Sequence, residues 1–134
     1  ELAAVMAAEP ERYERLGDID LELALVMGRG SDDAFRVRLS FHGITCDGAT
    51  EIAAGEEAAA DCWLGGDLAD WQAMFDNITE YGRAVGDWTL NTLTLFGDRI
   101  SLHATDPLGE DRFHRVNQTL QDFVDGAARL PANA

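Results

Sequence analysis

Three histidines and two cysteines are the side chains best suited to metal binding or nucleophilic chemistry: His42, His103, His114, Cys46 and Cys62. None of the histidines stands in an HxH, HxxxH or HExxH spacing, and neither cysteine belongs to a CxxC pair. Zinc sites use such short spacings because one turn or one helix face then delivers two ligands together. The sequence therefore predicts no metal site and no cofactor.

A reactive serine or cysteine is not indicated either. The chain contains no GxSxG elbow. Asp61 precedes Cys62, and a neighbouring carboxylate raises the pKa of a thiol, so that less of the reactive thiolate forms. We interpret both cysteines as small buried apolar residues in a reducing compartment, with a single disulfide as the alternative.

The run ADCWLGGDLADW, residues 60–71, has the order strand, glycine pair and helix start, in which backbone N–H groups can bind phosphate. It lacks the Lys and Ser/Thr of a P-loop and the third glycine of a dinucleotide fingerprint. Asp67 fits the N-cap of the helix, where its carboxylate would occupy the place of a phosphate. We therefore predict a sharp turn at Gly65 and Gly66 and no phosphate site.

The charge balance excludes several partners. The 134 residues include 25 acidic and 10 basic side chains, all of the latter arginines, for a net charge of -15. Such a surface repels nucleic acid and anionic membranes, because phosphate contacts require clustered basic residues. No window approaches the length of a membrane span, and the first residues lack the pattern of a signal peptide. We expect no stable membrane insertion and a cytoplasmic location.

The spacing of the apolar residues predicts the helices and strands that carry these side chains. Two short helices are predicted within residues 1–16, and strict alternation predicts strands at 19–27 and 35–44, joined by a turn at 28–33. A weaker edge strand is expected at 50–54.

A fourth strand is predicted at 60–64, followed by a helix over 67–81 with an apolar stripe at spacings of three and four. Leucines and isoleucine alternate over 93–104 about a Gly97-Asp98 turn, which favours a hairpin. Asp106 and Pro107 are typical of a helix start, and a last long helix is expected over 106–130.

Together these elements predict an α+β protein in which helices cover a mainly antiparallel sheet of five strands, or of six if the hairpin forms. The expected organisation is a single domain over residues 1–134. Its parts are the N-terminal helices (1–16), the sheet with the central helix (17–105) and the C-terminal helix (106–130).

The two late helices carry an excess of large apolar side chains. Packing of these side chains against the sheet is the plain interpretation, but as a set they could also line a cavity for a small molecule. The residues concerned are Leu68, Trp71, Met74, Phe75, Ile78, Phe113, Leu120 and Phe123.

Four stretches of the sequence carry a further signal: DLELAL and FRVRLSF, then ADCWLGGDLADWQAMFDNI and LNTLTLFGDRISL. They resemble the SCP2 family of sterol- and lipid-carrier domains, and the resemblance covers roughly residues 17–105. The chain departs from the family in the alternating RISLHAT that follows Gly97-Asp98 and in the added helix around FHRVNQTLQDFVDGAARL.

The resemblance implies a five-stranded sheet covered by helices, an apolar tunnel for sterols, fatty acyl chains or other lipids, and no catalytic residues. It also implies that the second and fourth strands are separated by the first, which would keep Cys46 and Cys62 apart. The residues on the helix over 67–81 would then cover the tunnel, and Phe113, Leu120 and Phe123 would form an added wall.

The expected function is therefore non-catalytic binding or transfer of an apolar small molecule or lipid. Two alternatives stay open: an enzyme that uses the same cavity, with His103 or Asp67 as a proton-transfer group, and an interaction domain with a filled core. Two further possibilities stay open: that the chain forms a homodimer, and that it is one part of a larger polypeptide. If Trp71 lines the cavity, Trp71→Ala should weaken ligand binding more than it lowers the melting temperature.

Overall fold

The computed structural model describes residues 1–28 and 34–130. Two N-terminal helices, α1 (Leu2–Ala7) and α2 (Pro10–Leu16), precede the sheet. Apart from Gly28, the turn predicted at 28–33 lies outside the described residues, as does the tail after Leu130.

Five strands form one sheet: β1 (Ile19–Met27), β2 (Phe35–Gly43), β3 (Thr45–Glu51), β4 (Cys62–Gly66) and β5 (Ile100–His103). Their order across the sheet is β3-β2-β1-β4-β5. The pairs β1–β2, β2–β3 and β4–β5 are antiparallel, and only β1–β4 is parallel. The predicted mainly antiparallel, five-stranded α+β architecture is confirmed.

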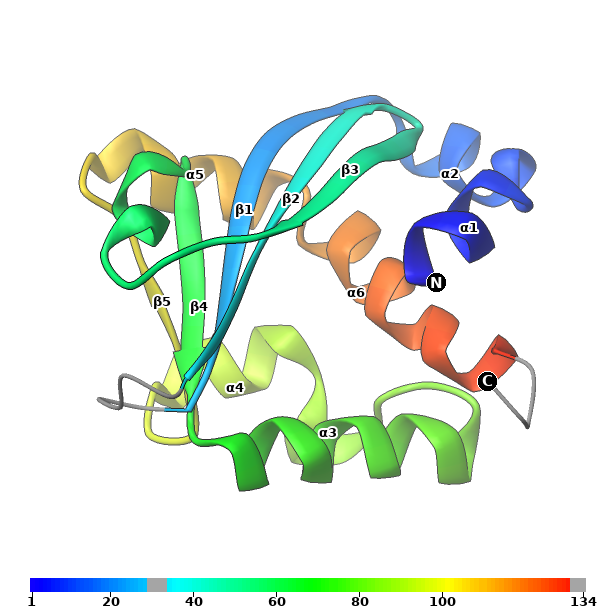
Figure 1. Ribbon diagram of the computed structural model, residues 1–134. Coiled ribbons are helices and arrows are strands. Elements are labelled where there is room, and N and C mark those ends of the chain that lie inside the picture. Colours follow the sequence, from blue (N-terminus) through cyan, green and yellow to red (C-terminus); the bar gives the residue numbers. More distant parts are fainter. Residues whose placement is uncertain (29–33, 131–134) are drawn as a thin grey trace.

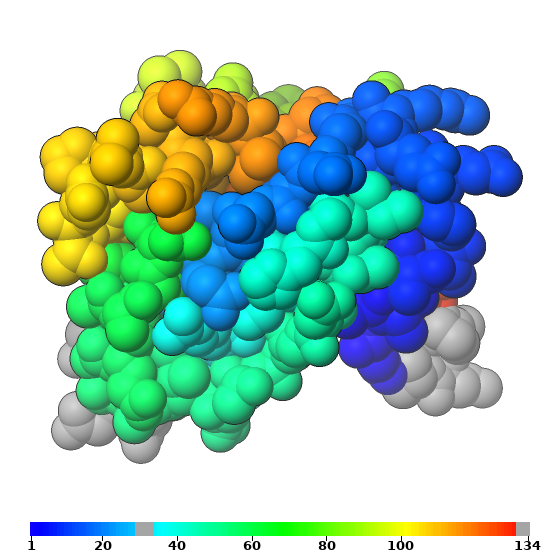
Figure 2. Space-filling view, turned by 90° about the horizontal axis from the view of Figure 1, so that it is seen from above, coloured from blue at the N-terminus to red at the C-terminus, as the bar shows by residue number. Residues whose placement is uncertain are grey.

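Helices cover one face of this sheet. They are α3 (Leu68–Tyr81), α4 (Leu90–Phe96), α5 (Pro107–Arg115) and α6 (Asn117–Asp125), with the short 3-10 turns η2 (Gly86–Trp88) and η3 (Gly126–Arg129) between or after them. A further 3-10 turn, η1 (Glu56–Ala59), lies between β3 and β4. Figure 1 shows α3 and α4 below the strands and α6 beside them. Seen from above, the orange α5 and α6 lie on one side of the sheet and the green segment between β3 and β4 on the other (Figure 2).

Alternation along the strands divides the sheet into two faces. In β1 the residues Ile19, Leu21, Leu23 and Leu25 are buried against the helices, whereas Asp20 between them is exposed. The core is closed by large side chains such as Phe41 and Phe123, whose rings meet edge to face with centroids 5.0 Å apart.

The predicted hairpin over 93–104 is wrong in its first half, because residues 90–96 form the helix α4. The segment LNTLTLF fits two hydrophobic periods. Leu93 and Leu95 stand two residues apart, as in a strand, whereas Leu90 and Leu93 stand three residues apart, as in a helix. The structure buries the second pair and leaves Leu95 exposed. Thr89 caps this helix by accepting a hydrogen bond from the Thr92 N–H, so local capping supports the helical choice.

The glycine pair does not form the predicted turn. Gly65 and Gly66 are the last residues of β4, and the chain turns only at Asp67. Asp67 is the N-cap residue of α3 as expected, but its side chain makes no capping hydrogen bond. Gly66 is required by packing, since a Cβ there would lie 2.5 Å from the carbonyl oxygen of Arg99, the residue before β5.

Two further boundaries differ from the expectation. The edge strand β3 begins at Thr45, five residues before the predicted start. Its sequence TCDGATE has little apolar alternation, and its register with β2 shifts opposite Ser40 and Phe41, so the sequence pattern did not indicate where the strand begins. The C-terminal helix is interrupted at Val116, whose φ of -115° and ψ of 17° are not helical, so that α5 and α6 run in different directions.

Candidate functional site

A small apolar pocket lies on the helix-covered face of the sheet. Its volume is about 210 Å³, and its walls include Leu25 and Met27 of β1, Val37 and Leu39 of β2, Phe75 of α3 and Phe123 of α6. Alternation explains the strand contribution, because these four positions all point toward the helices. We call this site the apolar pocket.

The first helix closes one side of the apolar pocket through Leu2 and Ala3. This helix approaches η3 closely at Gly126, where an added Cβ would lie 3.3 Å from Val5 Cγ1 and 3.6 Å from Leu2 Cδ2. Because glycine has no side chain, α1 can pack closely against η3 at this position and cover the pocket. The N-terminal helix thus supplies a wall that no spacing in its short sequence indicated.

The predicted ligand-binding residues separate into three groups. Phe75 and Phe123 line the apolar pocket. Leu68 is 62% exposed and points away from the core. The remaining five are buried within the core, at 1% exposure or less, and are not among the described residues that line the pocket: Trp71, Met74, Ile78, Phe113 and Leu120. Contact between any of these residues and a ligand stays a prediction.

Trp71 has a clear structural role. Its indole Nε1 donates a hydrogen bond to the Val26 carbonyl oxygen at 2.9 Å, which ties α3 to the central strand β1. A buried indole N–H needs such a partner, since leaving it unpaired costs about 1–3 kcal/mol. The bond fixes the angle at which Phe75, one turn further along α3, reaches the apolar pocket.

The two candidate proton-transfer groups lie elsewhere. His103 pairs in register with Trp63, on the sheet face opposite the helices, and Asp67 stands at the start of α3. Neither is among the described residues that line the apolar pocket. The structure does not bring them together with the apolar set that the sequence singled out.

The remaining histidines and the cysteines also occupy separate places. His42 Nδ1 lies 3.4 Å from an Asp20 carboxylate oxygen on the outer side of the sheet. Cys46 and Cys62 are buried free thiols on β3 and β4, which β2 and β1 separate as the strand order implied. Burial, with a smaller effect of Asp61, raises the pKa of Cys62 to about 12. Within residues 1–28 and 34–130, no group of three or more His, Cys, Asp or Glu side chains could hold a metal ion.

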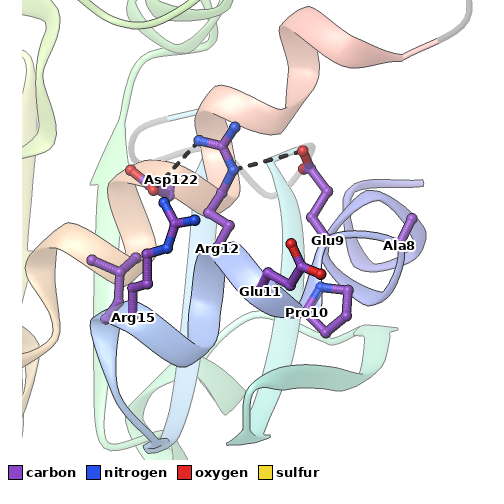
Figure 3. Close-up of a pocket in the computed structure, with 8 residues that line it drawn as sticks. Ala8, Glu9, Pro10, Glu11, Arg12, Arg15 and Asp122 are labelled. Carbon is purple, nitrogen blue, oxygen red and sulfur yellow. Dashed lines mark ion pairs between the residues drawn. The ribbon is translucent and has the colours of Figure 1, made fainter.

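A larger hollow of about 780 Å³ lies beside α2 and Asp122 of α6, and five of its eight described lining residues are charged. Figure 3 shows Arg12 reaching between Glu9 and Asp122, and the guanidinium-to-carboxylate distances are 3.6 and 3.7 Å. Because so many of the lining side chains are charged, the hollow is poorly suited to an apolar ligand.

No helix within the described part of the chain combines the length and apolarity needed to cross a membrane.

The fold is of the sterol carrier protein 2 type. The crystal structure of sterol carrier protein 2 superimposes with a TM-score of 0.67, at 19% sequence identity, over 97% of this chain and 95% of that chain. The solution structure of a conserved hypothetical protein from Thermus thermophilus superimposes with a TM-score of 0.58, at 18% identity, over 99% of this chain and 87% of that chain. No protein-family model and no curated protein matches the sequence.

Proposed function

We propose that this protein binds an apolar small molecule, a fatty acyl chain or a related lipid, in the apolar pocket. The supporting observation is the pocket itself. Apart from Glu1, every described residue that lines it is apolar, and it lies between sheet and helices, where a concave site can remove a ligand from water. The likeness in fold to sterol carrier protein 2 supports the same proposal.

The volume of the pocket favours a slender ligand. At about 210 Å³ it lies below the range of about 300–1,000 Å³ that is usual for drug-sized ligands. An extended acyl segment fits such a space, and each methylene that enters contributes about 0.8 kcal/mol. A rigid sterol nucleus requires α1 to move aside, which is feasible because a helix of 6 residues has little stability of its own.

The test uses two substitutions on the same helix. Ala3 lines the apolar pocket, whereas the neighbouring Ala4 is exposed. Ala3→Leu places three further carbon atoms in the pocket, and we expect the affinity for a fluorescent acyl probe to fall about tenfold, the equivalent of about 1.4 kcal/mol. Ala4→Leu is the matched control and should bind the probe as the unaltered protein does.

Native mass spectrometry of the purified protein gives an independent measurement, because a carrier retains apolar molecules through purification. A probe that does not bind, together with no co-purifying apolar molecule, would contradict the proposal and favour the alternative of a filled core. Equal affinities of the Ala3→Leu and Ala4→Leu variants would place the ligand outside the apolar pocket.

A further inference from the structure

A second concave site lies on the opposite face of the sheet. It has a volume of about 350 Å³, within the range of small-molecule sites, and is bounded by η1, β1, β4 and β5. The side chains that matter for its chemistry are Val26, Glu57, Trp63, Ser101 and His103, and Gly65 lies among them. We call this site the outer groove.

The register of the strands builds the floor of the outer groove. Gly65 of β4 stands between Val26 of β1 and Ser101 of β5 in one row across the sheet. Because Gly65 has no side chain, the backbone is uncovered at the centre of this row. A Cβ added there would meet only Val26 Cβ, at 3.9 Å, so the space above the strand is open.

Aromatic side chains form one wall. Two residues along the strands, on the same face, Trp63 pairs with His103, and their rings lie nearly parallel with centroids 5.6 Å apart. A hydrogen bond of 2.8 Å joins Ser101 Oγ to His103 Nε2. These contacts hold the Trp63 and His103 rings in place at the edge of the groove.

A carboxylate forms the opposite wall. Glu57 of η1 lines the groove, and its two oxygens accept hydrogen bonds from the Gly55 N–H at 2.8 and 3.1 Å. Arg36 Nε lies 3.4 Å from Glu57 Oε1, and both side chains are only 12% exposed. The carboxylate is thereby held in place at the wall of the groove, and a ligand cation shares it with the Arg36 guanidinium.

We propose that the outer groove binds a small organic cation with a flat apolar body, such as an aryl amidine or an arylalkyl amine. The cationic group meets the Glu57 carboxylate, and the ring or methylene surface lies over Gly65 against Trp63, where a cation is also attracted to the indole face. Apart from His103, Glu57 is the only ionisable side chain among the described residues that line the groove.

The charge of the molecule supports the same choice of ligand. A net charge of -15 raises the local concentration of cations and repels anions. This binding is separate from that in the apolar pocket, because the two sites occupy opposite faces of the sheet and share no described lining residue.

Isothermal titration calorimetry with benzamidine tests the proposal. Benzamide and benzoate serve as neutral and anionic ligands of similar shape. We expect benzamidine to bind about tenfold or more tightly than either, because only the cation gains the charged hydrogen bond to Glu57. Glu57→Gln keeps an acceptor oxygen but removes the charge and should abolish this preference.

Gly65→Val fills the floor of the groove and should eliminate benzamidine binding while the melting temperature and acyl-probe binding are retained. Gly48→Val is the matched control, since Gly48 is also a strand glycine with nothing within 4 Å of an added Cβ, but it lies on β3 away from the groove. Equal binding of benzoate, unchanged binding to the Gly65→Val variant, or no saturable binding of benzamidine up to about 10 mM would each overturn the proposal.

Discussion

Trp71 is a residue whose size suggests a ligand contact but whose surroundings indicate a structural role. It is 1% exposed and donates its indole hydrogen to the Val26 carbonyl oxygen, so its ring packs against the protein and its N–H already has a partner. Aromatic residues at helical spacing usually face the sheet, and the sequence could not distinguish a residue that packs from one that lines a cavity. Phe75, on the same stripe, reaches the apolar pocket instead.

We expect Trp71→Ala to lower the free energy of unfolding by about 3–5 kcal/mol, the usual cost of removing a large buried side chain. This reverses the expectation drawn from the sequence, in which the loss of binding dominates. Denaturant unfolding measures the change, and Leu68→Ala, on the exposed side of the same helix, should stay within about 0.5 kcal/mol of the unaltered protein. A similar loss of stability in both variants would contradict this role.

Between elements, a buried polar contact joins α6 to the segment that follows α3. Asp125 accepts hydrogen bonds from the Ala84 N–H at 3.0 Å and from Gln121 Nε2 at 2.9 Å, and Gln121 in turn accepts one from the Leu90 N–H at 2.7 Å. Asp125 is 8% exposed, and burial raises its pKa above the usual value. This contact positions α4 against α6 and was not visible in a sequence that reads simply NQTLQDFVD.

We expect Asp125→Asn to stabilise the protein at neutral pH. Because the pKa of Asp125 is raised by folding, its favourable contribution is complete below the ordinary pKa of aspartate and is lost as the pH rises through the raised value. Asparagine keeps an acceptor oxygen without this loss. The difference in melting temperature between variant and unaltered protein should be smallest below the ordinary pKa of aspartate, about 4, and grow as the pH rises above it.

Asp125→Ala is the contrasting substitution. It leaves the Ala84 N–H and Gln121 without this acceptor, and a loss of about 1–3 kcal/mol is expected at every pH. A pH-independent effect of Asp125→Asn would show that burial of the charge has no cost here.

The elements also show where prediction from sequence succeeds. The strands β1 and β2 and the helix α3 were predicted with nearly correct ends, because each has one buried face and a single clear period. The helix α4 was missed because its leucines fit both periods, and β3 was misplaced because an edge strand needs few apolar residues. A cavity was expected, and Phe75 and Phe123 were among the residues named for it, but the wall of Leu2 and Ala3 could not be predicted, since it depends on long-range packing of α1.

At the scale of the whole molecule, repulsion among acidic side chains opposes folding. The excess of 15 negative charges acts over the entire surface, whereas the ion pairs that offset it are mostly exposed and each contributes about 0–1 kcal/mol. Raising NaCl from 0.1 to 1 M shortens the screening length from about 10 to 3 Å. We therefore expect the melting temperature to rise with salt, because relief of the general repulsion outweighs weakening of the pairs.

Thermal unfolding at several NaCl concentrations measures this effect. Sucrose is the control, since an uncharged osmolyte strengthens burial without screening charge. A melting temperature that falls with salt would mean that local pairs such as Arg129 with Glu9, at 2.8 Å, contribute more than the general repulsion removes.

The central strand β1 separates the two sites, and its side chains alternate between them. Leu25 and Met27 face the apolar pocket, whereas Val26 between them faces the outer groove. A substitution at a single position of this strand therefore alters one site and leaves the side chains of the other untouched. Substitutions can accumulate on one face of this strand while the other face is inherited unchanged, so the two proposed sites are free to evolve separately.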